Sequence, residues 1–277
     1  MKTTFALCTV LSLACAGLVA CGSDSDDGAA APSGDQVDGG TDTKPDAAPP
    51  APTFVSNTPN AAVRAASQPR ADLVLVSSNF KQEASESRYY REWLGIVYNA
   101  GRDTVCQTQA EVSLRDTQSA ELVKFSSFVR APAFKSPSGA IFSLPCVAPG
   151  ERGVIYSNGF GPSEIAPTSV AVIDIQFEPS VYPGVIPHPD APAVSGALRP
   201  WGLGGRYTQF AGSVTGGAHA ISSLSVTTYP LDDKGLAVAQ LDESFSGGLA
   251  AGETRDFDTV AVQGNFTKYI QFVDLYQ

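Results

Sequence analysis

The two histidines are the side chains with the widest catalytic repertoire in this 277-residue chain, and neither stands in a catalytic motif. His188 lies between two prolines, and His219 follows Gly-Gly-Ala in a predicted turn. A hydrolytic triad needs a histidine held by a carboxylate beside a serine on a sharp turn. Ser157 lacks the Gly-x-Ser-x-Gly pattern of such a turn. We therefore expect both histidines in exposed turns and predict no catalytic residue.

Acidic side chains cluster in the second half of the chain, in the run from Asp232 to Gly235 and at Asp242 and Glu243. Calcium sites combine several loop oxygens, but neither segment has the spaced Asp-x-Asp-x-Asp pattern. We interpret the first run as the polar tip of a hairpin and predict neither a metal nor a cofactor. The glycines at 202, 204 and 205 lack the flanking strand and helix of a phosphate-binding loop, so we assign them to a linker.

Aromatic side chains offer a binding function instead. Tyr89, Tyr90 and Trp93 lie on one predicted strand and share its two faces, whereas Trp201 lies in a Pro- and Gly-rich segment. Exposed aromatic rings can stack on sugars or on a peptide. We place Trp93 in a core and name Trp201, Tyr89 and Tyr90 as candidate ligand-binding residues. For Trp201 we expect docking between two domains, with ligand contact as the alternative.

The N-terminus has the features of an export signal. Lys2 precedes a mainly apolar run from Phe5 to Val19, which is too short for a transmembrane helix. The run ends in Leu-Val-Ala-Cys at positions 18–21, which resembles the lipobox of bacterial lipoprotein signal peptides. The resemblance implies a signal peptide over residues 1–20 and lipidation of Cys21. It also implies a cell-envelope location, with the membrane as a partner through the lipid.

The residue after Cys21 bears on sorting between the two membranes of the envelope. Gly22 stands there instead of the Asp that retains some lipoproteins in the inner membrane. We therefore favour the outer membrane over the inner one.

The remaining cysteines follow from the same resemblance. Cys8 and Cys15 would leave with the signal peptide, and Cys21 would carry lipid, which leaves Cys106 and Cys146 in an oxidising compartment. We predict a disulfide between them, with two free thiols as the alternative. The bridge would close a loop of about 40 residues, worth roughly 4 kcal/mol in the chain-entropy model.

Residues 21–69 are predicted to form an acidic, disordered tether. Between Gly22 and Pro52 the chain has seven Asp, one Lys and almost no large apolar side chain. Such a segment cannot bury enough surface to offset its conformational entropy. A short Ala-rich helix within 53–69 is a further expectation. The formal net charge is −10, and no basic patch favours nucleic acid as a partner.

From Asp72 onward the hydrophobic period is two. Cys106, Thr108, Ala110, Val112 and Leu114 alternate with polar residues, as in a half-buried strand. Turn signals follow roughly every ten residues, and no segment keeps a helical apolar stripe. With 26 Gly and 20 Pro, the sequence predicts an all-β, antiparallel β-sandwich.

The second half of this region repeats the first. Gly95 to Asn99 corresponds to Gly212 to Gly216, and further matches join Asp116 with Asp232, Gly150-Glu151 with Gly252-Glu253, and Ile175-Gln176-Phe177 with Ile270-Gln271-Phe272. We predict two tandem sandwiches, residues 70–178 and 206–277, joined by a Pro- and Gly-rich linker over 179–205. One continuous sandwich is the alternative.

The repeated positions resemble the FxLYD-like and other immunoglobulin-like modules of bacterial envelope proteins. The residues that carry the resemblance are Gly95, Val97, Asn99, Asp116, Pro149, Gly150 and Glu151. The second copy has Gly216 in place of the Asn and Ala251 in place of the Pro. The resemblance implies an immunoglobulin-like fold for each copy.

Together these features predict a lipid-anchored cell-envelope lipoprotein with a non-enzymatic interaction or structural role. The partner would be another envelope protein. The first alternative is a carbohydrate-binding protein, which would require a planar row of exposed aromatic rings. The second is a hydrolase with an unrecognised site, which would require titratable side chains converging in one deep pocket.

Overall fold

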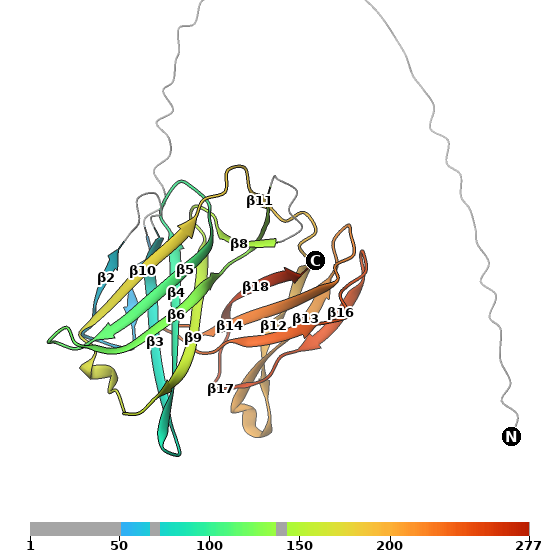
Figure 1. Cartoon of the computed structure of the whole chain (residues 1–277). Helices are drawn as coiled ribbons and strands as arrows, with labels where there is room; N and C mark the ends of the chain where they lie inside the picture. Colours follow the sequence, from blue (N-terminus) through green and yellow to red (C-terminus); the bar gives the residue numbers. More distant parts are fainter. Residues whose placement is uncertain (1–50, 67–72, 137–142, 277) are drawn as a thin grey trace, which may run out of the picture. The chain divides into compact units, whose positions relative to one another are not determined.

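Alternation of apolar and polar side chains builds mainly antiparallel strands in the computed structural model, which describes residues 51–66, 73–136 and 143–276. The predicted all-β class is confirmed (Figure 1). Helical structure in these ranges amounts to two turns of 3-10 helix, η1 (Pro167–Ser169) and η2 (Leu203–Gly205). The predicted signal peptide, Cys21 and the first part of the predicted tether lie outside the described residues.

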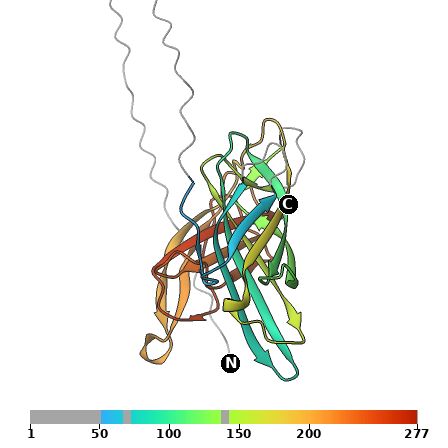
Figure 2. The same cartoon turned by 90° about the vertical axis from the view of Figure 1, so that its left-hand side faces the viewer.

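The first β-sandwich is built from the strands between residues 55 and 187 (Figures 1 and 2). They are β1 (Val55–Ser56), β2 (Ala62–Ala66), β3 (Leu73–Ser85), β4 (Arg88–Asn99), β5 (Val105–Arg115), β6 (Glu121–Arg130), β7 (Ala133–Lys135), β8 (Ser143–Val147), β9 (Arg152–Gly161), β10 (Val172–Ser180) and β11 (Ile186–Pro187). One layer has the order β1-β3-β4-β9, and the other has β2, β10, β5 and β6. β6 pairs first with β5 and then with β9, so it joins the two layers along one side.

Trp93 lies at the centre of this sandwich, as predicted, and is fully buried. Its Nε1 donates a hydrogen bond to Ser78 Oγ at 2.9 Å, which satisfies the polar atom of the indole. The indole stacks on Phe125, with ring centroids 6.5 Å apart. Gly95 makes room for it, because a Cβ there would lie 2.3 Å from Trp93 Cη2.

The second β-sandwich follows in the same chain order. Its strands are β12 (Ala193–Trp201), β13 (Tyr207–Thr215), β14 (Ser223–Leu231), β15 (Leu241–Phe245), β16 (Thr254–Asp258), β17 (Val262–Gln263) and β18 (Lys268–Tyr276). One layer is β12-β13-β16 with β17 on β13, and the other is β15-β14-β18. This order matches β3-β4-β9 and β6-β5-β10 of the first sandwich strand for strand.

The repeat extends to individual hydrogen bonds. Asn99 N donates to Glu151 O at 3.0 Å in the first sandwich, and Gly216 N donates to Glu253 O at 2.8 Å in the second. Asp116 Oδ1 accepts from the backbone N–H groups two and four residues later, and Asp232 Oδ1 does the same. The run from Asp232 therefore forms the predicted polar turn, held by its own carboxylate.

Two segments differ from the sequence predictions. Residues 193–201, assigned to the linker, form β12 and pair with β13 along their whole length. The strand forms because Val194 and Leu198 pack on the second core, a pattern that the surrounding Pro and Gly residues conceal. Residues 62–66, where an Ala-rich helix was expected, form β2 instead. This strand adds in parallel to the otherwise open edge of β10.

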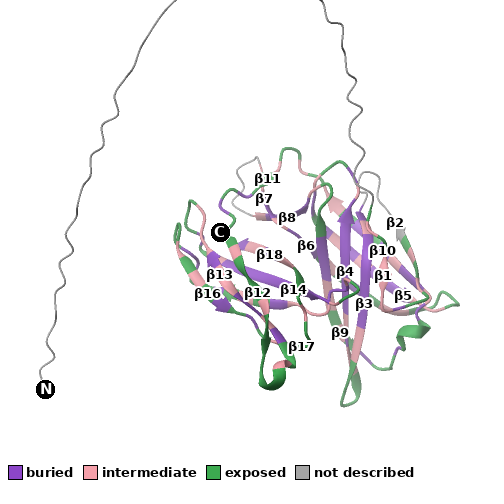
Figure 3. Ribbon diagram, turned by 180° about the vertical axis from the view of Figure 1, so that it is seen from behind, coloured by how far each residue is buried: buried purple, intermediate pink, exposed green. Residues whose placement is uncertain are grey.

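The two sandwiches share an apolar interface, the inter-sandwich core. It buries the outer face of β3-β4-β9 against the outer face of β14 and β18. The buried members are Val76, Leu94, Ile96, Tyr98, Val154, Tyr229, Leu231, Ala237 and Phe272. Because β4 is covered on both faces, every residue from Trp93 to Asn99 is buried. Figure 3 shows β4 and β14 in the buried colour along most of their length.

Polar contacts border this interface. Asn79 Nδ2 donates a buried hydrogen bond to Ala237 O at 2.7 Å. Arg130 forms an ion pair with Asp274. Burial raises the pKa of Asp274 above its usual value, and the charge of Arg130 offsets only part of that increase. Directional bonds of this kind fix the orientation of two surfaces that apolar packing alone would leave loosely specified.

Leu94→Ala tests whether the inter-sandwich core joins the two sandwiches into one folding unit. The side chain is fully buried, so we expect the free energy of unfolding to fall by about 3 kcal/mol while one cooperative transition remains. Denaturant unfolding of the full chain, followed by circular dichroism and tryptophan emission, measures both. Leu203→Ala is the matched control, because Leu203 is 97% exposed and should change stability by less than about 0.5 kcal/mol. Two separate transitions in the wild type would contradict the shared core.

Candidate functional site

The outer face of the β12-β13-β16 sheet is the candidate functional site. The second sandwich uses its other sheet, through β14 and β18, for the inter-sandwich core. Figure 3 shows β12 largely in the exposed colour. Alternate residues of β12 and β13 point outward, because Val194, Leu198, Phe210 and Val214 between them belong to the core.

Equivalent positions in the two sandwiches carry different side chains. The repeat aligns Leu94 and Ile96 of β4 with Ala211 and Ser213 of β13. In the first sandwich these outward residues are large and apolar and lie in the inter-sandwich core. In the second they are small, and they line an open hollow. The same strand is thus adapted to packing in one copy and to a surface in the other.

Trp201 and Tyr207 form the aromatic end of this face. They are directly paired across β12 and β13. Their rings meet edge to face, with centroids 6.0 Å apart and an angle of 79° between planes. Trp201 is 51% exposed and Tyr207 41% exposed. Trp201 is therefore not docked between domains, and the expectation of docking was wrong.

A polar trough of about 630 Å³ continues from the aromatic end. Its floor includes Ser195 and Ser213, whose Oγ atoms are hydrogen-bonded at 3.0 Å. Arg199 lines it from β12, and Asp256 and Asp258 line it from β16. We call these residues, with Trp201, Tyr207 and Gln209 beside them, the Trp201 face.

A pair of glycines lets β12 and β13 approach each other over the second core. Gly196 and Gly212 are opposite each other on β12 and β13. A Cβ on Gly212 would lie 2.2 Å from Ser195 O and 2.8 Å from Phe210 Cε1. Only glycine allows the two strands to approach above the Phe210 ring, which stacks on Phe257 beneath the sheet at 5.6 Å.

The hairpin between β12 and β13 presents the aromatic end. Gly202, Gly204 and Gly205 all have φ between 62° and 78°, a region that favours glycine. They hold Leu203 at the tip, where it is 97% exposed. This segment, predicted as part of a linker, is the turn that connects two strands of the candidate site.

Tyr89 and Tyr90 lie on β4 of the first sandwich, so the structure does not bring them together with Trp201. Tyr90 OH is 3.4 Å from Tyr156 OH, and Tyr156 OH donates to Glu92 Oε1 at 2.9 Å. Burial, with these hydrogen bonds, raises the pKa of Tyr156. Glu92 also lines a hollow of about 470 Å³. That hollow lies against the β14–β15 connection, where Lys81 Nζ donates to Val238 O.

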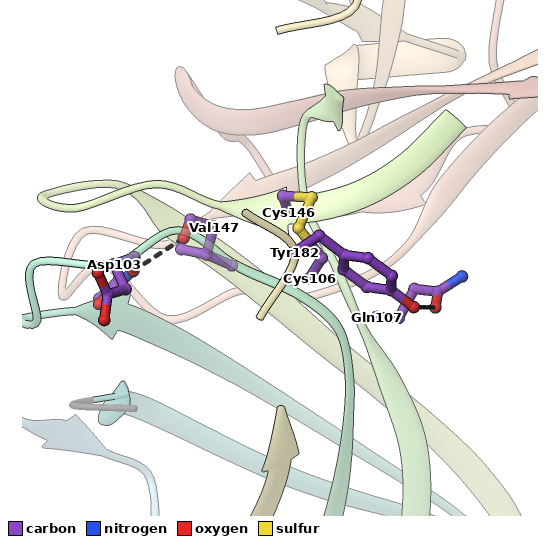
Figure 4. Close-up of a disulfide and its surroundings, with 7 residues drawn as sticks. Asp103, Cys106, Gln107, Cys146, Val147 and Tyr182 are labelled. Atoms are coloured by element: carbon purple, nitrogen blue, oxygen red, sulfur yellow. Dashed lines mark hydrogen bonds between the residues drawn. A yellow bond between two sulfur atoms is a disulfide. The ribbon is translucent and has the colours of Figure 1, made fainter. Parts of the chain in front are cut away.

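The predicted disulfide is present. Cys106 and Cys146 are both fully buried and join the neighbouring strands β5 and β8 (Figure 4). Tyr182 contributes to the apolar cluster around the bridge, and its OH donates to Gln107 Oε1 at 2.8 Å. A buried bridge of this kind has a structural role. Cys21, the predicted lipidation residue, lies outside the described residues.

The histidines have an arrangement that the sequence did not reveal. Asp190 Oδ1 is 2.7 Å from His219 Nδ1, and Asp190 N donates to His188 Nδ1 at 3.3 Å. His219 is exposed as predicted, but His188 is only 6% exposed, so that prediction was wrong. The bond from His188 N to Ala133 O holds the Pro-rich segment against β7 and thereby covers the ring.

Asp190 and His219 line an open depression of about 440 Å³ together with Lys135 and Ser222. The hydrogen bond from His219 lowers the pKa of Asp190, and burial lowers the pKa of His188. Within the described ranges no group of three or more His, Cys, Asp or Glu could hold a metal ion. No helix among those residues is long and apolar enough to span a membrane.

Comparison of the chain with protein-family models gave no match, and comparison with curated proteins gave none either. The candidate site therefore stands on its own geometry.

His188→Gln tests the buried imidazole through the pH dependence of stability. As the pH falls below about 6.5, the unfolded chain binds a proton at this imidazole before the folded chain does, because burial lowers its folded pKa. The free energy of unfolding of the wild type should therefore fall with pH from that point. In the His188→Gln variant, the decrease in the free energy of unfolding that begins near pH 6.5 should be absent.

Urea unfolding of both proteins between pH 7 and pH 3 measures the difference. A further loss below about pH 4, to which Asp190 contributes because its folded pKa is lowered, should remain in the variant. Parallel curves for wild type and variant across the whole range would contradict the assignment to His188.

Proposed function

We propose that the protein is a lipid-anchored envelope protein with a non-enzymatic role, and that it binds another envelope component on the Trp201 face. The lipobox resemblance at Cys21 and the acidic segment after it support the anchor. The buried Cys106–Cys146 disulfide agrees with export to an oxidising compartment. Gly22, which follows Cys21, favours the outer membrane over the inner membrane.

The observation that carries the binding role is the contrast between equivalent sheets. The outer face of β3-β4-β9 is buried in the inter-sandwich core, whereas the outer face of β12-β13-β16 is open. Trp201 and Tyr207 are exposed on this face, and aromatic rings contribute large contact areas when a partner buries them at an interface. The face therefore has the composition of a binding surface.

Binding is better supported than hydrolysis. The trough is open to solvent, and reactions that depend on charge stabilisation use sites from which water is excluded. The alternative centre for hydrolysis is the depression with Asp190 and His219. There the side chain of His219 is 78% exposed, so it lacks the enclosed setting of a general base.

Cys21→Ala tests the anchor. Cells that express the wild-type chain should incorporate labelled palmitate into it, and the mature protein should have the mass of a lipidated chain that begins at Cys21. The variant should take up no label, because the thiol to which the lipid would be attached is missing. Cys15→Ala, a cysteine change within the same segment, is the control and should leave labelling unchanged. Equal labelling of all three proteins would refute the lipid anchor.

Trp201→Ala tests the binding role. The full-length lipidated protein, immobilised in detergent, should recover an envelope component from fragmented envelopes, and the variant should recover much less of it. Phe128→Ala is the control, because Phe128 is 59% exposed on β6 of the first sandwich. Protein mass spectrometry and sugar analysis of the eluate give the readout. Recovery that is identical for all three proteins would exclude the Trp201 face as the binding surface.

A further inference from the structure

We propose that the Trp201 face binds a neutral polysaccharide, with one sugar ring against Trp201 and the next units lying along the trough. The proposal rests on the proposed function, since it names the chemical class of the component bound at that face. It depends on three features of the face: its aromatic end, its polar groups without protein partners, and its charge.

The aromatic end offers one ring for stacking. Tyr207 contacts the Trp201 indole edge to face, so it braces the indole on one side while half of the Trp side chain stays exposed. The apolar C–H face of a pyranose ring packs on such a surface, whereas its hydroxyl groups point sideways. The rings do not form the planar row that the sequence hypothesis required, so a single stacking position is inferred.

The trough next to Trp201 offers hydrogen-bonding groups. Arg199, Asp256 and Asp258 make no side-chain hydrogen bond or ion pair with any other described residue. Gln209, which is paired with Arg199 across the sheet, is also without such a partner there. A carboxylate accepts bonds from neighbouring hydroxyls, and a guanidinium or amide donates to them. Sugar hydroxyls both donate and accept, so a glycan can satisfy all of these groups at once.

The small floor of the trough sets the depth at which a chain would lie. Ser195, Ala211 and Ser213 replace the large outward residues of the equivalent strands in the first sandwich. A trough with a floor of small side chains and polar walls, next to the exposed Trp201 ring, is better matched to a sugar chain than to a peptide.

The charges of the face select a neutral glycan. Asp256 and Asp258 lie side by side in the trough with Arg199 as the one cation that lines it. Uronic acids, phosphorylated sugars and anionic lipid headgroups would be repelled by this field, and no basic patch favours nucleic acid.

Tryptophan emission of the full-length protein in detergent micelles tests the proposal directly. The chain has two tryptophans, of which Trp93 is fully buried, so a change in emission reports on Trp201. The probes are cellohexaose, maltohexaose, mannohexaose and chitohexaose. We expect at least one of them to give a saturable change, and calorimetry then gives its Kd.

Three variants locate the bound sugar. Trp201→Ala should weaken binding at least about tenfold, as for an aromatic anchor at an interface. Ser213→Ile fills the floor with the residue that stands at the equivalent position of β4, so it should weaken binding while the fold is kept. Phe128→Ala should leave the Kd unchanged, because this exposed side chain lies on the first sandwich. Equal binding by all variants would overturn the proposal.

Other outcomes separate this proposal from the binding role itself. If none of the four hexasaccharides binds, or if only alginate or anionic phospholipid vesicles change the emission, a neutral glycan is excluded. If the Trp201-dependent component recovered from envelopes is a protein, the binding role stands and the glycan assignment falls. If neither sugars nor an envelope component depend on Trp201, both proposals fall.

Discussion

The burial of two outer sheet faces against each other is the constraint on which the rest of the structure depends. An isolated β-sandwich keeps its outer faces in water, but here the β4 sheet is covered on both sides. Leu94 and Ile96 face the second sandwich, while Trp93 and Val97, which flank them, face the first core. The continuous apolar run in this strand is the direct result. Each sandwich therefore buries an apolar sheet face of the other.

That constraint also explains how one repeated topology yields two different surfaces. Both copies share a set of three plus three strands in the same order, and both have the same turn, at Asp116 and at Asp232. The differences are concentrated where the copies face different surroundings. Ile96 is buried between the sandwiches, and its counterpart Ser213 lines the trough. The outward residues of the second copy's β12-β13-β16 sheet are therefore not constrained by packing against the other sandwich.

Local patterns in the sequence predicted the features that depend on local physics. Alternation predicted the strands, and Trp93 was correctly placed in a core. The pairing of Cys106 with Cys146 was predicted from the cysteines that remain once those of the predicted signal peptide and the predicted lipidation residue are set aside. The residues of β12 were missed because proline and glycine dominate the segment, although its apolar residues at 194 and 198 are spaced for a half-buried strand. The burial of His188 depends on a contact with Ala133, 55 positions away, that no local pattern encodes.

The candidate site was predicted only in part, for the same reason. Trp201 was named, but Tyr207, Arg199, Asp256 and Asp258 were not, because they meet Trp201 through strand pairing and through β16, which lies about fifty residues further along the chain. The one available signal was the period of two in β12, which places Ser195, Arg199 and Trp201 on one face. Tyr89 and Tyr90 were aromatic and partly exposed, but they belong to the other sandwich.

β1 pairs in parallel with β3, and β2 pairs in parallel with β10, which has a mechanical consequence. β1 and β2 lie at the start of the described chain. A pull directed along β1 would load its two residue pairs with β3 in shear, and a pull passed on along β2 would load its five pairs with β10 in the same way. Bonds loaded in shear share the force and break together, whereas bonds at the end of a hairpin open one after another. The five parallel pairs of β2 with β10 would therefore resist such tension more than the two pairs of β1 with β3.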